Sequence, residues 1–217
     1  MSKLAIVLAE FGRPAPDVTQ FRKTWPEAEI QVFAGVELPD VPRWQRTHPR
    51  YGWRMQDYWK VRKLLDSGAD IAISFDADMR IVNREDARVM PLLAEQFGLC
   101  LPLNPRYLVR VDTQIGADSD GVLDETRGCG LSLNCSPIAL NLNDYAASVC
   151  AENYCDEMLA HPVRGPLCWW RAIWQCGFWP CVLPPQFCVC QEHIGCGNEI
   201  IIHEGHDKVK RHYANLL

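Results

Sequence analysis

The first third of the chain alternates apolar runs with amphipathic stretches, the pattern of strands and helices in an α/β sheet. Continuous apolar runs at 4–9 and 30–34 predict buried strands, and the mixed segment 18–25 predicts the helix that connects them. A glycine and two prolines within 12–16 break the chain directly after the first strand. An open α/β sheet commonly places a ligand-binding loop at this point.

The next segments bring two aspartates to the end of a buried strand. Prolines and glycine within 37–52 predict an irregular excursion, and the pattern over 54–66 predicts a helix. The β-rich run 70–75 then predicts a strand buried in the sheet, followed at once by Asp76-Ala77-Asp78. We therefore expect two carboxylates at the carboxyl edge of a central strand.

The rest of the chain continues the same alternation without a linker that would separate two domains. The pattern predicts a helix at 84–97, a strand at 100–103, a loop-like stretch to 130, a strand at 131–142, a helix at 166–175, a turn at 184–185 and a strand at 199–203 before a charged tail. The predicted fold is a single α/β domain over 1–217, with a mostly parallel sheet flanked by helices.

Composition narrows the class of protein. The chain has 217 residues, 48% of them hydrophobic, which is enough for one substantial core. A net charge of -5 gives no overall attraction to a polyanion or an anionic membrane. The apolar N-terminal run is too short for a secretory signal, and no segment approaches the roughly 18 apolar residues of a membrane span. We expect a soluble, cytoplasmic protein.

The Asp76-Ala77-Asp78 segment carries the clearest chemistry. Two carboxylates at a strand end can supply hard oxygen ligands to one divalent cation, Mn²⁺ or Mg²⁺, whose open positions accept the oxygens of a diphosphate. The same tripeptide also occurs in solvated turns and helix N-caps, but its position after a buried strand favours the metal site. Nucleotide sugars are donors of this diphosphate type.

Three short segments, in order along the chain, resemble a known family. Ala72–Asp78, with Trp59-Lys60 upstream, resembles the stretch that leads into the Asp-x-Asp of GT-A fold glycosyltransferases. Asn134–Leu142 is similar in spacing to the Asn-Ser-Gly strand of the glycogenin and bacterial galactosyltransferase group, glycosyltransferase family eight. His203–Lys208 resembles the C-terminal His-x-Gly-x-x-Lys of that group. Cys135 and Ser136 stand where the family has Ser-Gly.

The resemblance implies a metal-dependent glycosyltransferase that moves a hexose from a nucleotide sugar, with a UDP-sugar as the expected donor, to a hydroxyl group with retention of configuration. Residues 1–103 would form the nucleotide-sugar half and 104–217 the acceptor half, including a C-terminal metal and diphosphate segment. The implied site residues are Asp76, Asp78 and His203 at the metal, Lys60, Gly205 and Lys208 at the donor diphosphate, and Asn134 at the sugar. Imidazole, glycine backbone and lysine suit these roles chemically.

The identity of a catalytic acid or base stays open in the sequence. The family's Asp-Gln is absent before Trp169-Trp170, and a retaining reaction can let the leaving phosphate assist the acceptor. The acidic candidates are Asp112, Asp118, Asp120, Asp124 and Glu192. The acceptor is equally open: a saccharide, a lipid-linked sugar, a protein or a modified base in DNA.

Cysteine and tryptophan concentrate in the second half. All 11 cysteines lie between Cys100 and Cys196, and the group Cys188, Cys190, His193 and Cys196 has the ligand types of a structural zinc site. Buried apolar thiols are the other interpretation. Trp170 and Trp174 recur at helical spacing, which predicts a buried helix face, although some tryptophans could form a platform for a sugar or a base.

Two other functions fit parts of this pattern. A metal-dependent nucleotidyltransferase or phosphotransferase could use the same paired aspartates on a phosphorus centre, and the His-x-Gly-x-x-Lys segment argues against it. The other alternative is a non-catalytic binding module, stabilised by zinc through the cysteine-rich half.

Overall fold

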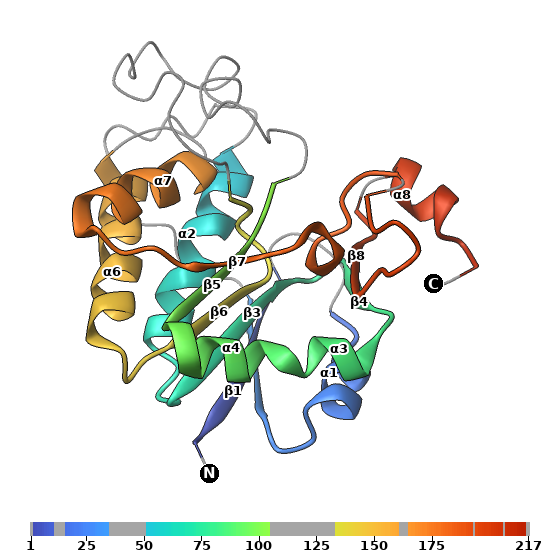
Figure 1. The fold of residues 1–217 in the computed structure, drawn as a ribbon, viewed down its shortest axis with the longest axis horizontal. Coiled ribbons are helices and arrows are strands. Elements are labelled where there is room, and N and C mark those ends of the chain that lie inside the picture. The colour runs from blue at the N-terminus through green and yellow to red at the C-terminus, as the bar shows by residue number, and fades with distance from the viewer. Residues whose placement is uncertain are drawn as a thin grey trace.

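The computed structural model describes residues 2–10, 16–34, 51–104, 133–160, 165–192, 194–205 and 207–215 (Figure 1). Helices and strands alternate over much of this part of the chain, as the sequence pattern predicts. The described helices are all too short or too polar to cross a membrane.

A six-stranded sheet runs through the centre of the described residues, in the order β2-β1-β3-β6-β5-β7. The strands are β1 (Leu4–Glu10), β2 (Glu29–Ala34), β3 (Ile71–Asp76), β5 (Leu99–Pro102), β6 (Ile138–Asn141) and β7 (Cys181–Leu183). Only β6 runs antiparallel to its neighbours, β3 and β5. The prediction of a mostly parallel sheet is confirmed.

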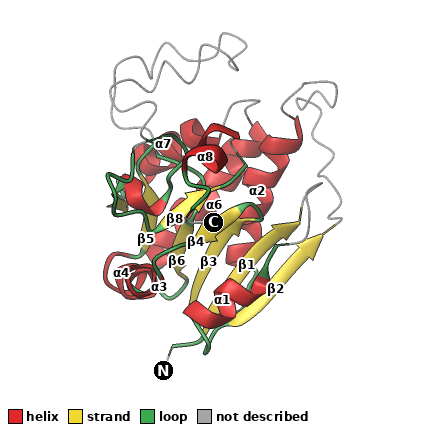
Figure 2. Cartoon of the chain, turned by 90° about the vertical axis from the view of Figure 1, so that its right-hand side faces the viewer, coloured by secondary structure: helices red, strands yellow, loops and turns green. Residues whose placement is uncertain are grey.

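Helices cover both faces of this sheet and enclose two hydrophobic cores (Figures 1 and 2). One face packs against α1 (Val18–Thr24), α3 (Arg84–Ala87) and α4 (Val89–Phe97). The other packs against α2 (Tyr51–Leu65), α6 (Tyr145–Ala160) and α7 (Gly165–Cys176). Alternate side chains of β1 enter alternate cores, as the period-2 geometry of a strand requires.

A second, smaller sheet lies beyond the end of β3. It pairs β4 (Met79–Ile81) with β8 (Ile201–His203), which are 120 residues apart in the chain but antiparallel neighbours in space. A short 3₁₀-helix (Pro185–Phe187) leads from β7 toward β8, and α8 (Asp207–His212) follows β8. This sheet determines where the candidate metal ligands lie.

The structure departs from the sequence pattern in several places. The strand expected over 131–142 is only β6, because Pro137 cannot donate to a ladder and the chain bends at 135–137 before it. Leu133 instead forms an isolated bridge with Leu103. The helix expected at 84–97 is split at Arg88 into α3 and α4. Helices α6 and α8 and strands β4 and β7 were not predicted. The loop expected to 130 lies largely outside the described residues.

The α2, α6 and α7 side of the sheet is organised around one aromatic pair. Tyr154 of α6 and Trp169 of α7 are both fully buried, and their rings stack with centroids 4.1 Å apart. These two helices pack extensively on each other and hold the C-terminal half on the sheet. We therefore expect this stack to contribute strongly to stability.

Replacing Trp169 by Ala should lower the free energy of unfolding by about 3–5 kcal/mol, because it leaves a large cavity in a packed core. Tyr145→Ala is the control, since Tyr145 is 84% exposed at the start of α6. That change should stay within about 0.5 kcal/mol of the wild type. Urea unfolding followed by circular dichroism measures both, and equal midpoints would contradict the prediction.

Candidate metal centre

Two carboxylates mark the carboxyl end of β3. All six residues of this strand are buried, and its last residue is Asp76. Ala77 and Asp78 then turn the chain into β4. The side chains of Asp76 and Asp78 are 12% and 18% exposed, so both lie in a largely enclosed site with an opening to solvent.

The pairing of β4 with β8 brings His203 to these carboxylates. Met79 is the register partner of His203, so the imidazole lies beside the turn that carries Asp78. Its Nε2 atom is 3.0 Å from Asp78 Oδ1 and 3.8 Å from Asp76 Oδ2. One ligand atom from each of the three side chains lies within 4.8 Å of the others. The structure thus brings together three residues that span 127 positions of the sequence.

Two contacts hold the backbone around Asp78 next to the backbone around His203. The Glu204 N–H donates to the Asp78 carbonyl oxygen at 2.8 Å, which extends the β4–β8 ladder by one bond. The Arg80 guanidinium of β4 lies 2.6 Å from the Glu204 carboxylate. These contacts fix the backbone from which two of the three ligand side chains project.

The other edge of β4 is closed by the buried side chain of Gln20 from α1. Its amide donates to the Met79 carbonyl oxygen and accepts from the Ile81 N–H, both at 2.9 Å. A side chain thereby satisfies the two backbone groups that a neighbouring strand would otherwise pair. The sequence analysis did not identify Gln20, and no local motif indicates it.

Asp76 Oδ1 is held from α2 by the ammonium of Lys60 at 2.7 Å and the amide of Gln56 at 3.3 Å. Lys60 is almost fully buried and also lies 3.0 Å from Asp57. Because Oδ1 is engaged in this way, Oδ2 is the Asp76 oxygen near His203. The i, i+3 and i, i+4 spacing of 56, 57 and 60 indicates that these residues share one helix face, but not that this face meets Asp76.

Lys60 keeps its charge despite its burial. Desolvation lowers the pKa of its ammonium, but the charges of Asp76 and Asp57 together raise this pKa by more, so that it lies above the ordinary lysine value. Because folding raises the pKa of Lys60, the ion pair stabilises the fold fully at pH values below about 10.4, the ordinary pKa of lysine. This stabilisation is lost only as the pH rises through the higher pKa of the folded state. The positive charge beside Asp76 is therefore permanent at physiological pH.

The loop before β6 supports the same strand end. Ser136 Oγ accepts the Asp76 N–H at 3.0 Å, so this hydroxyl fixes the backbone of the first carboxylate. Two residues earlier, the Asn134 amide donates to Cys188 Sγ at 3.1 Å and accepts from the Cys135 N–H at 2.8 Å. The structure places Asn134 within this support, and a contact with the donor sugar stays a prediction.

The three side chains fit a small divalent cation. Ligand atoms about 2.1 Å from one Mg²⁺-sized ion are separated by roughly 3–4.2 Å. The two separations from His203 Nε2, 3.0 and 3.8 Å, fall in that range, and all three ligand atoms lie within 4.8 Å of one another. The two carboxylates are ligands that suit Mn²⁺ and Mg²⁺, and the imidazole adds one softer nitrogen ligand. Lys60 offsets one of the two negative charges of Asp76 and Asp78. The other negative charge is left for a bound cation to neutralise.

The remaining predicted donor residues are less defined. Gly205 lies exposed in the turn directly after β8, one residue beyond Glu204. Lys208 belongs to the first turn of α8, and its side chain is outside the described residues, as is His206. The Lys60 ammonium contacts carboxylates, and its contact with a donor phosphate stays a prediction. Glu192 is exposed in a turn, and the other acidic candidates lie outside the described residues: Asp112, Asp118, Asp120 and Asp124.

The cysteine-rich segment gives no second cluster of metal ligands in the part of the chain that the structure describes. Cys188 is buried, Cys190 is half-buried and Cys196 is exposed, while His193 lies outside the described residues. The hydrogen bond with Cys190, together with burial, raises the pKa of Cys188 well above its ordinary value. A structural zinc that uses His193 stays a prediction.

Comparison with known proteins identifies the fold. No family model and no curated protein matches the sequence. A solved glycosyltransferase involved in the glycosylation of the major capsid of PBCV-1 has a TM-score of 0.54 to this chain, at 7% identity, over 98% of this chain and 99% of its own. The chain has a GT-A type fold. The finer resemblance to family eight stays a prediction.

Two further solved structures are similar at lower TM-scores. Mouse xyloside xylosyltransferase 1 has a TM-score of 0.49 at 10% identity, over 95% of this chain and 98% of its own. The 2-C-methyl-D-erythritol 4-phosphate cytidylyltransferase from Thermus thermophilus has a TM-score of 0.44 at 12% identity, over 84% of this chain and 88% of its own.

Replacing Lys60 by Met should lower the free energy of unfolding by about 3 kcal/mol, because it leaves Asp76 without its buried counter-charge. Millimolar Mn²⁺ should restore more stability to this variant than to the wild type, since the cation then supplies the missing charge. Urea unfolding with and without Mn²⁺ measures both effects.

Lys63→Met is the matched control on the same helix. The Lys63 ammonium lies 5.5 Å from the centroid of the Trp59 ring and is not part of the metal centre. Its loss should change stability by no more than about 0.5 kcal/mol. If Lys60→Met unfolds at the same urea concentration as Lys63→Met, the ion pair does not have the role assigned to it.

Proposed function

We propose that this protein is a metal-dependent glycosyltransferase that uses a nucleotide-sugar donor. The single observation that carries the proposal is the grouping of Asp76, Asp78 and His203 at the carboxyl end of a central strand. In open α/β sheets, ligands bind at this edge. The GT-A type fold, found in enzymes that transfer sugars from nucleotide diphosphates, agrees with that assignment.

The reaction follows from the charge that develops at the donor. The bond between the anomeric carbon and the diphosphate oxygen breaks, and the nucleoside diphosphate leaves with the bonding electrons. The acceptor oxygen bonds to the anomeric carbon, and its proton passes to an oxygen of the leaving phosphate or to water. When bound, Mn²⁺ or Mg²⁺ would stabilise the negative charge of the leaving group.

Each predicted site residue then has a proposed task. Asp76, Asp78 and His203 would hold the cation, and Lys60 and Ser136 would hold Asp76 in position. The backbone at Gly205 and the charge of Lys208 would meet the diphosphate, and Asn134 would contact the sugar. A UDP-sugar is the donor we test first, and retention of configuration is the outcome that the family-eight resemblance implies. The nucleotide would lie over 1–103 and the acceptor over 104–217.

The released product distinguishes this function from its alternatives. The protein is incubated with Mn²⁺ and a panel of nucleotide sugars, and the nucleotide products are separated by ion-pair chromatography. Release of a nucleoside diphosphate supports glycosyl transfer or hydrolysis. Pyrophosphate release from nucleoside triphosphates would instead support a nucleotidyltransferase. A purified protein that contains tightly bound zinc and turns over none of these compounds would support the zinc-stabilised binding module.

Asp78→Asn should lower the Mn²⁺-dependent release of nucleoside diphosphate by about a hundredfold or more. Losing one of two anionic ligands removes several kcal/mol of charge stabilisation from the leaving group. Asp156→Asn, at an exposed position of α6, is the control and should retain the wild-type rate. Activity of Asp78→Asn equal to this control, or wild-type activity that persists in EDTA, would exclude the metal centre.

His203→Ala and Lys208→Ala should separate metal binding from donor binding. Imidazole can ligate the cation, whereas a protonated lysine contributes only charge to the phosphates. His203→Ala should therefore weaken both Mn²⁺ and UDP, by about tenfold or more, and Lys208→Ala should weaken mainly UDP. Isothermal titration with Mn²⁺ alone, then with UDP in saturating Mn²⁺, measures this. Equal Mn²⁺ affinities for His203→Ala and the exposed control His212→Ala would rule out His203 as a ligand.

A further inference from the structure

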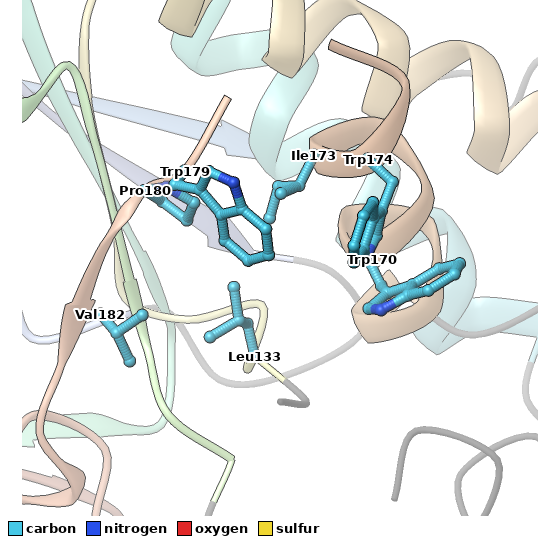
Figure 3. Close-up of a pocket in the computed structure, with 7 residues that line it drawn as sticks. All are labelled: Leu133, Trp170, Ile173, Trp174, Trp179, Pro180 and Val182. Atoms are coloured by element: carbon cyan, nitrogen blue, oxygen red, sulfur yellow. The ribbon is translucent and has the colours of Figure 1, made fainter. Parts of the chain in front are cut away.

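An apolar cavity of about 230 Å³ opens between α7 and the edge strand β7 (Figure 3). We call it the indole cavity. Its described lining consists of apolar side chains: Leu133, Trp170, Ile173, Trp174, Trp179, Pro180 and Val182. The polar atoms that these side chains carry are the three indole nitrogens.

Three indoles form one wall of the indole cavity. Trp170 and Trp174, one helical turn apart on α7, have ring centroids 5.8 Å apart, and Trp174 meets Trp179 edge-on at 5.5 Å. Trp174 is 52% exposed and Trp179 is 66% exposed. The sequence analysis predicted a buried helix face from the spacing of 170 and 174, and the exposure of Trp174 shows that this prediction is wrong. Large apolar side chains gathered around a concave opening are the signature of a binding site, whereas single exposed ones are ordinary.

The indole cavity and the candidate metal centre are joined by one short segment of the chain. Leu133 lines the cavity, and three residues later Ser136 accepts the backbone N–H of Asp76. Three residues span at most about 11 Å of chain. The segment therefore limits the distance between the two sites to about the length of one small molecule.

The chemistry of the lining selects the kind of group that fills it. Among the described lining residues, the only polar groups are three indole N–H donors, so most hydroxyls of a sugar ring placed here would lack hydrogen-bond partners there, which is unfavourable. An aromatic or alicyclic group would exchange water for contact with three indole faces at no such cost. The volume is smaller than the roughly 300–1,000 Å³ of sites that enclose a whole ligand, so the cavity takes one part of a larger molecule.

We propose that the indole cavity binds a ring-sized apolar aglycone of the acceptor. The acceptor would then be a glycoside or alcohol that carries a hydrophobic group, with its reacting hydroxyl directed to the metal centre. The role of this ligand as an acceptor rests on the proposed glycosyl transfer. The binding of an apolar ring in the indole cavity does not depend on it.

Matched glycosides test the proposal without donor or metal. Isothermal titration compares p-nitrophenyl and methyl glycosides of the same sugar, for glucose, galactose and xylose. The p-nitrophenyl glycosides should bind about tenfold or more tightly, because only they carry an apolar ring to bury.

Trp179→Ala and, separately, Trp174→Ala should remove most of this difference. Both side chains are at least half exposed, so the fold should survive, which circular dichroism checks. Tyr145→Ala, an exposed aromatic on α6, should keep the difference.

Three results would overturn the proposal. Equal affinities for the aryl and methyl glycosides would show that the cavity does not take an apolar ring. An aryl preference that survives both tryptophan changes would place the ring elsewhere. A dimer in sedimentation velocity that Trp179→Ala dissociates would show that a second copy fills the cavity. Failure to release nucleoside diphosphate with Mn²⁺ would overturn the proposed function alone, since the titrations contain neither donor nor metal.

Discussion

The site depends on the buried ion pair between Lys60 and Asp76. A carboxylate at the end of a fully buried strand loses its hydration, and an isolated charge in that position costs several kcal/mol. Lys60 offsets this cost from α2, and it is itself held in its charged form by Asp76 and Asp57. The pair therefore allows the sheet to end in a carboxylate. With Asp78 added, the strand end still has more negative than positive charge, which is the electrostatic condition for binding a cation.

Backbone hydrogen bonds then determine which side chains surround that charge. The β4–β8 ladder fixes His203 opposite Met79, and Gln20 closes the other edge of β4 with two hydrogen bonds from one amide. A strand of three residues has few ladder bonds of its own, so these external contacts give it a defined position. The distances among the ligand atoms are thus a consequence of pairing between distant segments and not of the Asp-x-Asp motif alone.

The sequence could predict the elements whose signal is local. The apolar run 70–75 and the acids after it indicated β3 and its carboxylates. The resemblance of 203–208 to the His-x-Gly-x-x-Lys of family eight indicated that His203 lies near these carboxylates. The sequence could not indicate that Gln20 pairs with β4 or that Lys60 turns toward Asp76, because both contacts depend on how helices pack on the sheet. Strand β7 was missed for a similar reason, since it has three residues and is defined by its neighbour β5.

The segment 133–136 contacts both the indole cavity and the support of the candidate metal centre. Within four residues it lines the indole cavity through Leu133, contacts Cys188 through Asn134 and holds the Asp76 backbone through Ser136. It is also extended and bent where a regular strand was expected, because Pro137 interrupts the ladder. Its side chains nevertheless alternate as in a strand: Leu133 and Cys135 enter the core on the α2, α6 and α7 side, whereas Asn134 and Ser136 contact Cys188 and Met79 of the other core. This alternation lets consecutive residues line the indole cavity on one side and support Asp76 on the other, so one short segment is what keeps the two sites close together along the chain.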